Sequence, residues 1–233
     1  MVSKKKQVKE EHPEEVIESA INRTEFFIQK NGKTLLTILI VIVVIAGGLA
    51  GYRYLHKVPR QNKAAAAIFP AQNLFAADSL AAALNGDGNN MGFLDVIQTY
   101  GSTESGNLAK HYAGQCYLRM GDYDNAIKYF GMYKDVKGIS AKLVNAMNAG
   151  LTGDAYVQKG DLDKGVSFYS KAVSASDDLL TTSYYLFKSG QIYQKQGNNA
   201  KALEAYKTIK QKYPRSQEAS EIDKYIAQLE QAL

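Results

Sequence analysis

Residues 34–52 constrain this chain most, because they form an uncharged and mainly aliphatic run with a charged residue on each side. As a helix, this run would extend about 28 Å, close to the thickness of the hydrocarbon core of a bilayer. Tyr52 and Tyr54 stand at its C-terminal end, where aromatic rings favour the membrane–water interface. No other run in the sequence approaches this length. The pattern therefore favours a transmembrane helix at residues 34–55 over the alternative, a buried helix of a globular core.

The formal charge of +5 is concentrated around this run. Residues 1–33 carry seven Lys/Arg and six Asp/Glu, residues 34–60 carry three Lys/Arg and no acid, and residues 61–233 carry eighteen Lys/Arg and seventeen Asp/Glu. A downstream segment that is so nearly neutral lacks the basic surface that binds a nucleic-acid backbone. We therefore expect no nucleic-acid partner.

The lysines of the tail favour a cytoplasmic N-terminus by the positive-inside rule. The bias is small, because four basic residues lie within a short distance after the run: Arg53, Lys57, Arg60 and Lys63. A cleaved signal peptide is the alternative, but its basic region would be unusually long. We predict a charged cytoplasmic tail at residues 1–33, the transmembrane helix at 34–55, a linker at 56–62 and one exported all-α domain at 63–233.

Cysteine and histidine are too sparse for a metal centre. Cys116 is the single cysteine, and His12, His56 and His111 are far apart in the sequence. The sequence therefore predicts no internal disulfide, no metal site and no cofactor.

Small residues recur along the predicted membrane helix. Gly47 and Gly51 are four residues apart, and Ala46 and Ala50 repeat that spacing beside them. In a membrane such residues let another helix approach closely, where hydrophobicity gives no drive for association. We interpret these four residues as a candidate face for helix packing.

A Gly-x2-Tyr-x3-Gly pattern occurs three times downstream. Its copies begin at Gly114, Gly153 and Gly190, so their periods are 39 and 37 residues. After each closing glycine come a small residue and then an aromatic residue at fixed spacing: Ala126 and Phe130, Gly165 and Tyr169, Ala202 and Tyr206. This is the pattern of the tetratricopeptide repeat, a pair of antiparallel helices that stacks on its neighbours. The first glycine is expected to let the paired helices touch, and the tyrosine to fill the space between them.

These repeats predict a helical solenoid with defined boundaries. The three copies cover about residues 107–140, 146–179 and 183–216. Residues 64–100 are interpreted as a degenerate first copy, in which Pro70 should kink or restart an Ala-rich helix. Residues 216–233 carry an apolar face on one side only, which is typical of a terminal capping helix, with Ser216 as its N-cap.

No arrangement of residues typical of catalysis is present, so we expect a binding protein and not an enzyme. The pairs Asp122/Asp124 and Asp161/Asp163 lie in predicted turns between helices, where Gly-Asp is ordinary turn and capping chemistry. The surface that remains is the groove lined by the first helix of each repeat. Its candidate residues are His111, Gln115, Arg119, Asp154, Gln158, Tyr184, Phe187, Gln191 and Lys195.

The residues around the apolar run resemble a known family. Glu25-Phe26-Phe27, Asn31-Gly32-Lys33 and Gly51-Tyr52-Arg53-Tyr54 are similar to the flanks of the membrane helix in the ancillary SecYEG translocon subunit (YfgM-like) family. The resemblance implies a single-pass protein of the bacterial inner membrane with a periplasmic tetratricopeptide domain. It also implies a non-enzymatic chaperone role, with SecYEG, a periplasmic peptidyl-prolyl isomerase chaperone and exported polypeptides as partners. The alternative is an adaptor tethered to another envelope assembly, such as secretion or outer-membrane machinery.

Overall fold

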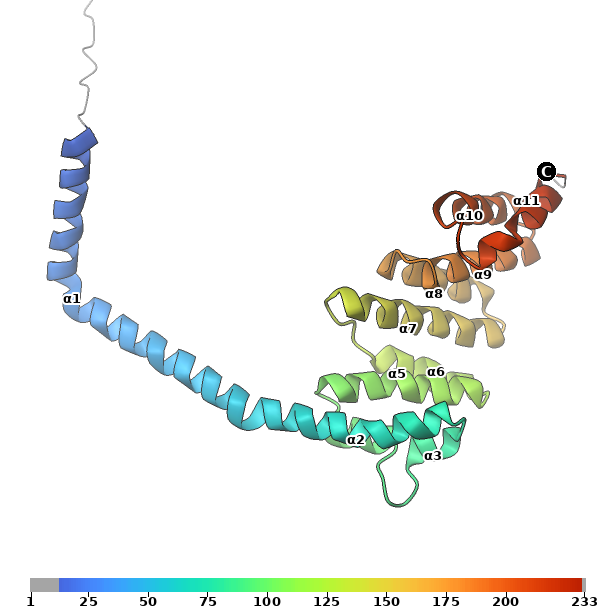
Figure 1. The fold of residues 1–233 in the computed structure, drawn as a ribbon, viewed down its shortest axis with the longest axis horizontal. Helices are drawn as coiled ribbons and strands as arrows, with labels where there is room; N and C mark the ends of the chain where they lie inside the picture. Colours follow the sequence, from blue (N-terminus) through green and yellow to red (C-terminus); the bar gives the residue numbers. More distant parts are fainter. Residues whose placement is uncertain (1–12, 232–233) are drawn as a thin grey trace, which may run out of the picture. The chain divides into compact units, whose positions relative to one another are not determined.

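The computed structural model describes the backbone of residues 13–231, so most of the tail's lysines and His12 lie outside the described residues. The chain divides into two compact units, residues 1–59 and residues 60–233. Every regular element in the described part of the chain is helical, which confirms the all-α prediction. The elements run from α1 to α11 and are labelled in Figure 1.

The described part of the N-terminal unit is one long helix. α1 spans Pro13–Tyr52 and continues into a short π-helical segment, η1, at Arg53–Lys57. The predicted tail and the predicted membrane span therefore belong to the same helix as far as the structure describes them. The stretch Ile21–Ala76 includes a segment that is long and apolar enough to cross a membrane. The aliphatic side chains of this segment, such as Ile38, Val43 and Leu49, are more than half exposed, as a helix solvated by lipid requires.

The predicted linker at residues 56–62 is helical. Its residues belong to η1 and to α2, which spans Val58–Ala76, and the boundary between the two units falls after Pro59. Pro59 comes directly after the wider π-helical turn η1, and its ring nitrogen cannot donate a helical hydrogen bond. The sequence therefore indicated where the units divide, but not that the connection is a helix.

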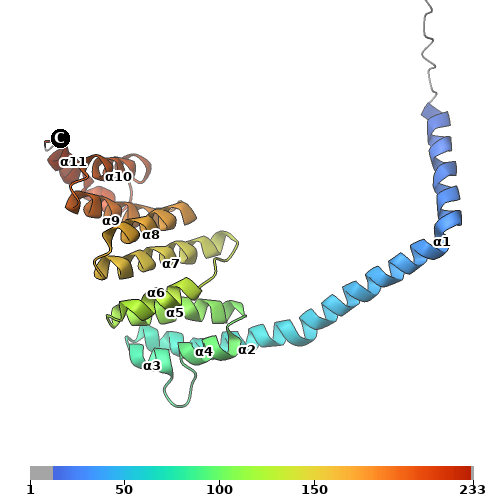
Figure 2. The ribbon, with the colours of Figure 1, turned by 180° about the vertical axis from the view of Figure 1, so that it is seen from behind.

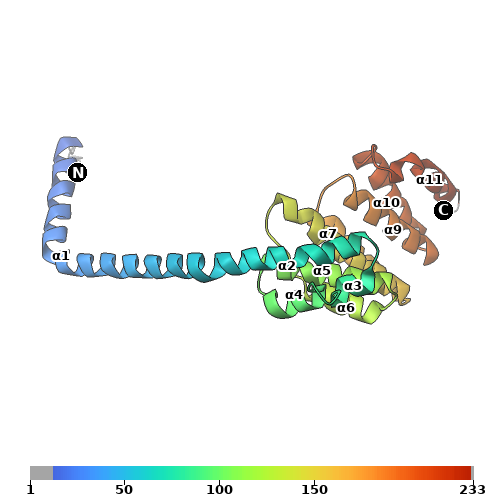
Figure 3. The same cartoon turned by 60° about the horizontal axis from the view of Figure 1, so that its bottom comes forward.

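The first part of the C-terminal unit shows no restart of the helix at Pro70, which was one of the two predicted effects of this residue. α2 passes through Pro70, and the break comes instead at Asp78, whose φ of 60° lies in the left-handed region. Two short helices follow, α3 at Leu80–Asn85 and α4 at Phe93–Tyr100. Figure 3 shows α2 beside α3, α4 and α5. Ile68 and Ala71 of α2 belong to the apolar core of these helices, so packing compensates for the hydrogen bond that Pro70 cannot make.

Three helix pairs follow and stack in chain order, as Figures 1 and 2 show from opposite sides. The first pair is α5 (Glu104–Arg119) and α6 (Tyr123–Met132). The second is α7 (Ile139–Gln158) and α8 (Leu162–Ala175), and the third is α9 (Thr181–Lys195) and α10 (Asn199–Lys212). Each pair overlaps one of the three predicted copies, but α5, α7 and α9 begin before the predicted starts at residues 107, 146 and 183.

The glycines of the repeat pattern act as expected, but the tyrosines do not. A Cβ atom added at Gly190 would lie 2.3 Å from the Tyr206 ring, and Gly114 and Gly153 are covered in the same way by Phe130 and Tyr169. The aromatic residue of the second helix therefore fills the space between the paired helices. The tyrosines that were predicted to do so lie at the edge of each pair, where Tyr117, for example, stacks on Tyr129 with ring centroids 5.2 Å apart.

The stack ends in the predicted apolar face. Ile222, Ile226 and Leu229 of α11 (Ile222–Glu230) are buried against α10. Ser216, predicted as the N-cap of this helix, caps a different element: its Oγ accepts a hydrogen bond of 3.2 Å from the N–H of Ala219. That residue belongs to the 3-10 turn η2 (Glu218–Ser220), which precedes α11.

Candidate peptide-binding groove

A groove of about 470 Å³ lies along the first helices of the three pairs. Arg119, Asp154, Gln158 and Gln191, all of them sequence-predicted groove residues, line it together with side chains that the prediction did not include. The latter are Leu118, Tyr123, Val157, Tyr169, Lys188 and Ile192. The groove therefore combines an apolar base with polar groups contributed by α5, α7 and α9.

A small polar network stands in this groove. Oδ1 of Asp154 accepts a hydrogen bond of 2.6 Å from the Tyr169 hydroxyl and one of 2.8 Å from Nζ of Lys188. The side chains of Asp154 and Lys188 are only 17% and 25% exposed, so bulk water screens the pair incompletely. Nζ of Lys188 also lies 4.6 Å from the ring centroid of Tyr184, within the range of a cation–π contact.

The environment fixes the charge states of this network. Burial alone would lower the pKa of Lys188, but the Asp154 carboxylate and Tyr184 together outweigh burial and raise that pKa above its ordinary value. Burial and the Asp154 carboxylate together raise the pKa of the Tyr169 hydroxyl. At neutral pH the network therefore holds a cationic lysine and a neutral tyrosine around one carboxylate, and these groups rigidly connect α7, α8 and α9.

The ends of the groove are polar. Arg119 forms an ion pair of 2.6 Å with Asp78, and its guanidinium lies 5.1 Å from the Phe75 ring centroid. Gln158 and Gln191 are exposed on α7 and α9. Each carboxamide can donate and accept a hydrogen bond, which matches the N–H and C=O groups of an extended peptide backbone.

Two predicted groove residues do not face the groove. His111 is 2% exposed, and its Nδ1 lies 3.0 Å from Oδ1 of Asn148, between the first and second pairs. Phe187 packs on Tyr206 and Tyr225, with ring centroids 5.8 and 5.2 Å away. Phe187 lies one helical turn before Gln191, and His111 lies two turns before Arg119. At these positions the side chains face a neighbouring helix instead of the groove.

The remaining predicted residues lie beside the groove lining. Gln115 is half-buried on α5, Tyr184 is 41% exposed beside Lys188, and Lys195 is exposed in the last turn of α9. Lys188 is the functional candidate that sequence reasoning missed. It lies two residues before Gly190, whereas the corresponding residues of the other copies are Tyr112 and Leu151. A single cation at a position that is otherwise apolar was the available signal.

The position of His111 leads to a prediction for pH. Burial lowers its pKa from the ordinary 6.5, and the hydrogen bond to Asn148 only partly offsets this. Below pH 6.5 the unfolded chain therefore binds more protons than the folded chain, so stability is complete above that pH and falls as the pH is lowered through and below it. Urea unfolding in detergent should show a lower midpoint at pH 5.5 than at pH 7.5. The matched variant His111→Gln, whose amide can still donate to Asn148, should lose much of this dependence, and an equal dependence in both proteins would contradict the assignment.

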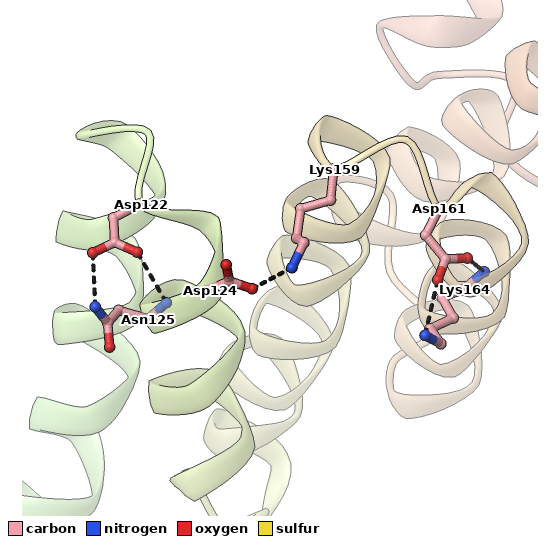
Figure 4. A network of polar contacts seen from close by, with 6 residues as sticks. All are labelled: Asp122, Asp124, Asn125, Lys159, Asp161 and Lys164. Atoms are coloured by element: carbon pink, nitrogen blue, oxygen red, sulfur yellow. Dashed lines mark hydrogen bonds and ion pairs between the residues drawn. The ribbon is translucent and has the colours of Figure 1, made fainter.

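Asp122 and Asp161 cap the helices that follow the turns, as Figure 4 shows. Oδ1 of Asp122 accepts a 3.1 Å hydrogen bond from the N–H of Asn125, and Asp161 does the same for Lys164. Asp124 forms an ion pair with Lys159 of the next repeat. Among the described residues, no group of three or more His, Cys, Asp or Glu side chains could hold a metal ion.

The candidate packing face of α1 is open. A Cβ atom added at Gly47 or Gly51 would meet nothing within 4 Å in the described chain, and Ala46 and Ala50 are exposed beside them. This face is therefore available to another helix, and its use remains a prediction.

Comparison with known families agrees with the geometry of the stack. Two family models, both described as tetratricopeptide repeat, match the chain: one at residues 109–135 and 184–216, the other at residues 151–179. The C-terminal unit contains tetratricopeptide repeats. Each match falls on one of the three predicted copies, whereas residues 64–100 lie outside all three matches and remain a prediction as a degenerate copy. A comparison with curated proteins gives no match.

Such repeats build surfaces for protein–protein interaction. The chain is therefore a candidate interaction scaffold, with one long apolar helix that is compatible with a membrane anchor.

Proposed function

We propose that this protein is a membrane-anchored tetratricopeptide scaffold whose groove holds extended, largely uncharged polypeptide segments. The groove on α5, α7 and α9 carries this proposal, because it places exposed carboxamides beside apolar side chains on a rigid surface. An extended chain can present its backbone to the amides and its apolar side chains to Leu118, Val157 and Ile192.

The charges of the groove support an uncharged ligand. Arg119 and Lys188 each have an aspartate partner within the protein, at 2.6 and 2.8 Å. An acidic peptide would have to compete with these partners. The groove also has no counterpart of the lysine and asparagine residues with which some tetratricopeptide domains bind a C-terminal carboxylate, since the corresponding positions include Gln115, Asp154 and Gln191.

The location that we propose is the bacterial inner membrane, with the N-terminus in the cytoplasm and the repeats in the periplasm. The apolar part of α1 is exposed along its length, which suits lipid, and the tail's lysines suit the cytoplasmic side. Exported chains cross this membrane unfolded, so a groove for extended segments would have suitable ligands there.

Within this location we propose an ancillary role beside the SecYEG channel, together with a periplasmic peptidyl-prolyl isomerase chaperone. The support is the resemblance around the membrane helix, including Phe26 and Phe27, which are 68% and 57% exposed. Exposed aromatic side chains next to a membrane span are available to a membrane partner. The alternative is an adaptor for another envelope assembly, which the same anchor and repeats would serve.

Two pull-downs from mild detergent test whether the groove binds peptide and whether the membrane helix binds SecYEG. Gln158→Ala with Gln191→Ala should weaken the binding of an extended, uncharged peptide bait by about tenfold, on the scale of two lost hydrogen bonds. The matched control, Gln98→Ala with Gln211→Ala, changes two exposed glutamines outside the groove and should leave binding intact.

The second arm concerns the anchor. Gly47→Ile with Gly51→Ile should reduce co-purification with SecYEG without changing peptide capture, because bulky side chains prevent close helix packing. If the glycine variant keeps SecYEG and the groove variant loses it, the repeats hold the complex and the membrane helix is only a tether. Co-purification with a different envelope assembly in place of SecYEG would favour the adaptor.

A further inference from the structure

Residues 132–143, which comprise the end of α6, the α6–α7 connection and the first residues of α7, expose apolar side chains that the stack does not use. Ile139 is 89% exposed, and Met132, Val136 and Leu143 are each about 40% exposed. These four residues follow one another within a short stretch of the chain. An exposed apolar cluster of this kind is typical of an interaction surface.

Lysines are interleaved with these apolar side chains. Lys134, Lys137 and Lys142 are all exposed, and Asp135 is the one acid of the segment. None of the three lysines forms an ion pair with another described residue of the chain. Lys134 also contributes, after burial, to the lowered pKa of nearby Lys110, so the local field is positive. Apolar and cationic side chains in alternation match a surface that offers both anionic headgroups and acyl chains.

Two asparagines hold this segment in place. Asn107 of α5 makes two hydrogen bonds to the backbone of Lys134, of 2.7 and 2.9 Å. Asn145 of α7 does the same for Val136, at 2.9 and 3.2 Å. The side chain of Val136 is therefore presented outward by a backbone that is fixed, and its exposure is not the result of a loose loop.

The segment lies at the edge of the C-terminal unit where α2 begins. There Arg60 donates a 2.7 Å hydrogen bond to the carbonyl of Thr99, and Gln61 accepts one of 3.1 Å from the N–H of Glu104 at the start of α5. Asn107, one turn further along α5, reaches Lys134. Figures 1 and 2 show the α6–α7 connection and the start of α2 at the same edge. The predicted end of the membrane span, Tyr52, precedes Arg60 by only a few residues.

We propose that residues 132–143 contact the anionic headgroups of the bilayer in which α1 is anchored, with Ile139 inserted among the acyl chains. This inference rests on the membrane anchor of the proposed function but not on its peptide-binding groove. Lys63 of α2, in the same unit, is exposed as well. The tether keeps this surface close to lipid, so a contact that is weak by itself is populated.

The test uses the full-length protein in lipid nanodiscs, with a bimane fluorophore on Ile139→Cys and brominated lipids as quenchers. The native Cys116 is buried, and burial raises its pKa to about 12, so it should not take the label. Met120→Cys is the matched control, because Met120 is 43% exposed at the other end of α5. In nanodiscs containing phosphatidylglycerol, we expect quenching at residue 139 and little at residue 120.

Charge dependence provides the second comparison. A lysine near an anionic surface contributes about a fivefold factor to binding. Lys134→Gln, Lys137→Gln and Lys142→Gln together should therefore reduce quenching at residue 139 to the control level, as should nanodiscs of phosphatidylcholine alone. Equal quenching at residues 139 and 120, or none at residue 139, would overturn the lipid contact and point to a protein partner for this surface.

Failure of this proposal can be told apart from failure of the proposed function. A chain that does not remain in the nanodisc would refute both the anchor and the lipid contact. A chain that remains, captures the peptide bait and shows no quenching at residue 139 would refute the lipid contact alone. Quenching without peptide capture would support the contact and refute the groove.

Discussion

Gly190→Ala is expected to lower the free energy of unfolding by about 1–3 kcal/mol, the usual cost of overpacking a core. The new Cβ atom would lie 2.3 Å from the Tyr206 ring. That ring is fully buried between Phe187 and Tyr225, and its hydroxyl donates a 3.0 Å hydrogen bond to Gln194. The ring therefore cannot retreat without disturbing both the third helix pair and the cap.

Gly131→Ala is the matched control for this substitution. Gly131 lies in α6, and a Cβ atom there would meet nothing within 4 Å. Alanine should stabilise this helix by about 0.4–1 kcal/mol, since it restricts the unfolded chain more than glycine does. Urea unfolding of both variants in detergent provides the measurement. Similar shifts for Gly190→Ala and Gly131→Ala would mean that the contact between glycine and the aromatic ring does not define the repeat core.

The pair Asp154 and Lys188 is expected to give the second large effect. Lys188→Met and Asp154→Asn should each lower the free energy of unfolding by about 1–3 kcal/mol, because each leaves a partly buried charge without its partner. The asparagine keeps an acceptor for the Tyr169 hydroxyl, so the variant isolates the charge. In a double-mutant cycle we expect a coupling energy of about 1–2 kcal/mol.

A second ion pair, which is more exposed, provides a comparison for this coupling energy. Lys207 and Glu230 are 2.7 Å apart, but their side chains are 46% and 50% exposed. Water and salt screen such a pair, so its coupling should be much smaller and should decline further in high salt. If the coupling between Asp154 and Lys188 is no larger than that of the exposed pair, the network does not fix the floor of the groove. Peptide binding measured on the same variants would then be expected to remain unchanged.

Sequence periodicity was a good guide wherever one local rule decides the structure. The positive φ angles of Gly121, Gly160 and Gly197, 82°, 87° and 73°, end the first helix of each repeat because only glycine adopts them without strain. Asp122, Asp161 and Asn198 then cap the second helix for an equally local reason. These signals recur at fixed spacing, so the three repeats could be read from the sequence.

Reasoning from local sequence failed where packing against another helix decides the structure. Pro70 predicted a kink or a restart of the helix. The core around Ile68 and Ala71 keeps α2 continuous, so there is no restart, and the chain turns at Asp78, which pairs with Arg119. His111 was assigned to the groove from its helical spacing alone. In the structure that side chain is buried, and its Nδ1 lies 3.0 Å from Oδ1 of Asn148 on the next repeat. Spacing along one helix cannot indicate which neighbouring helix covers a given position.

The sequence by itself determined the uncharged run of residues 34–52, the repeats and the helix ends, because these depend on hydrophobicity and on backbone conformations set within a few residues. Only the tertiary structure decided which side chains form the groove, since Asp154, Tyr169 and Lys188 come from three helices and meet through packing. It also decided that the apolar side chains of Met132, Val136, Ile139 and Leu143 stand exposed at the edge of the C-terminal unit. Both surfaces depend on contacts between repeats, and such contacts have no fixed spacing in the sequence.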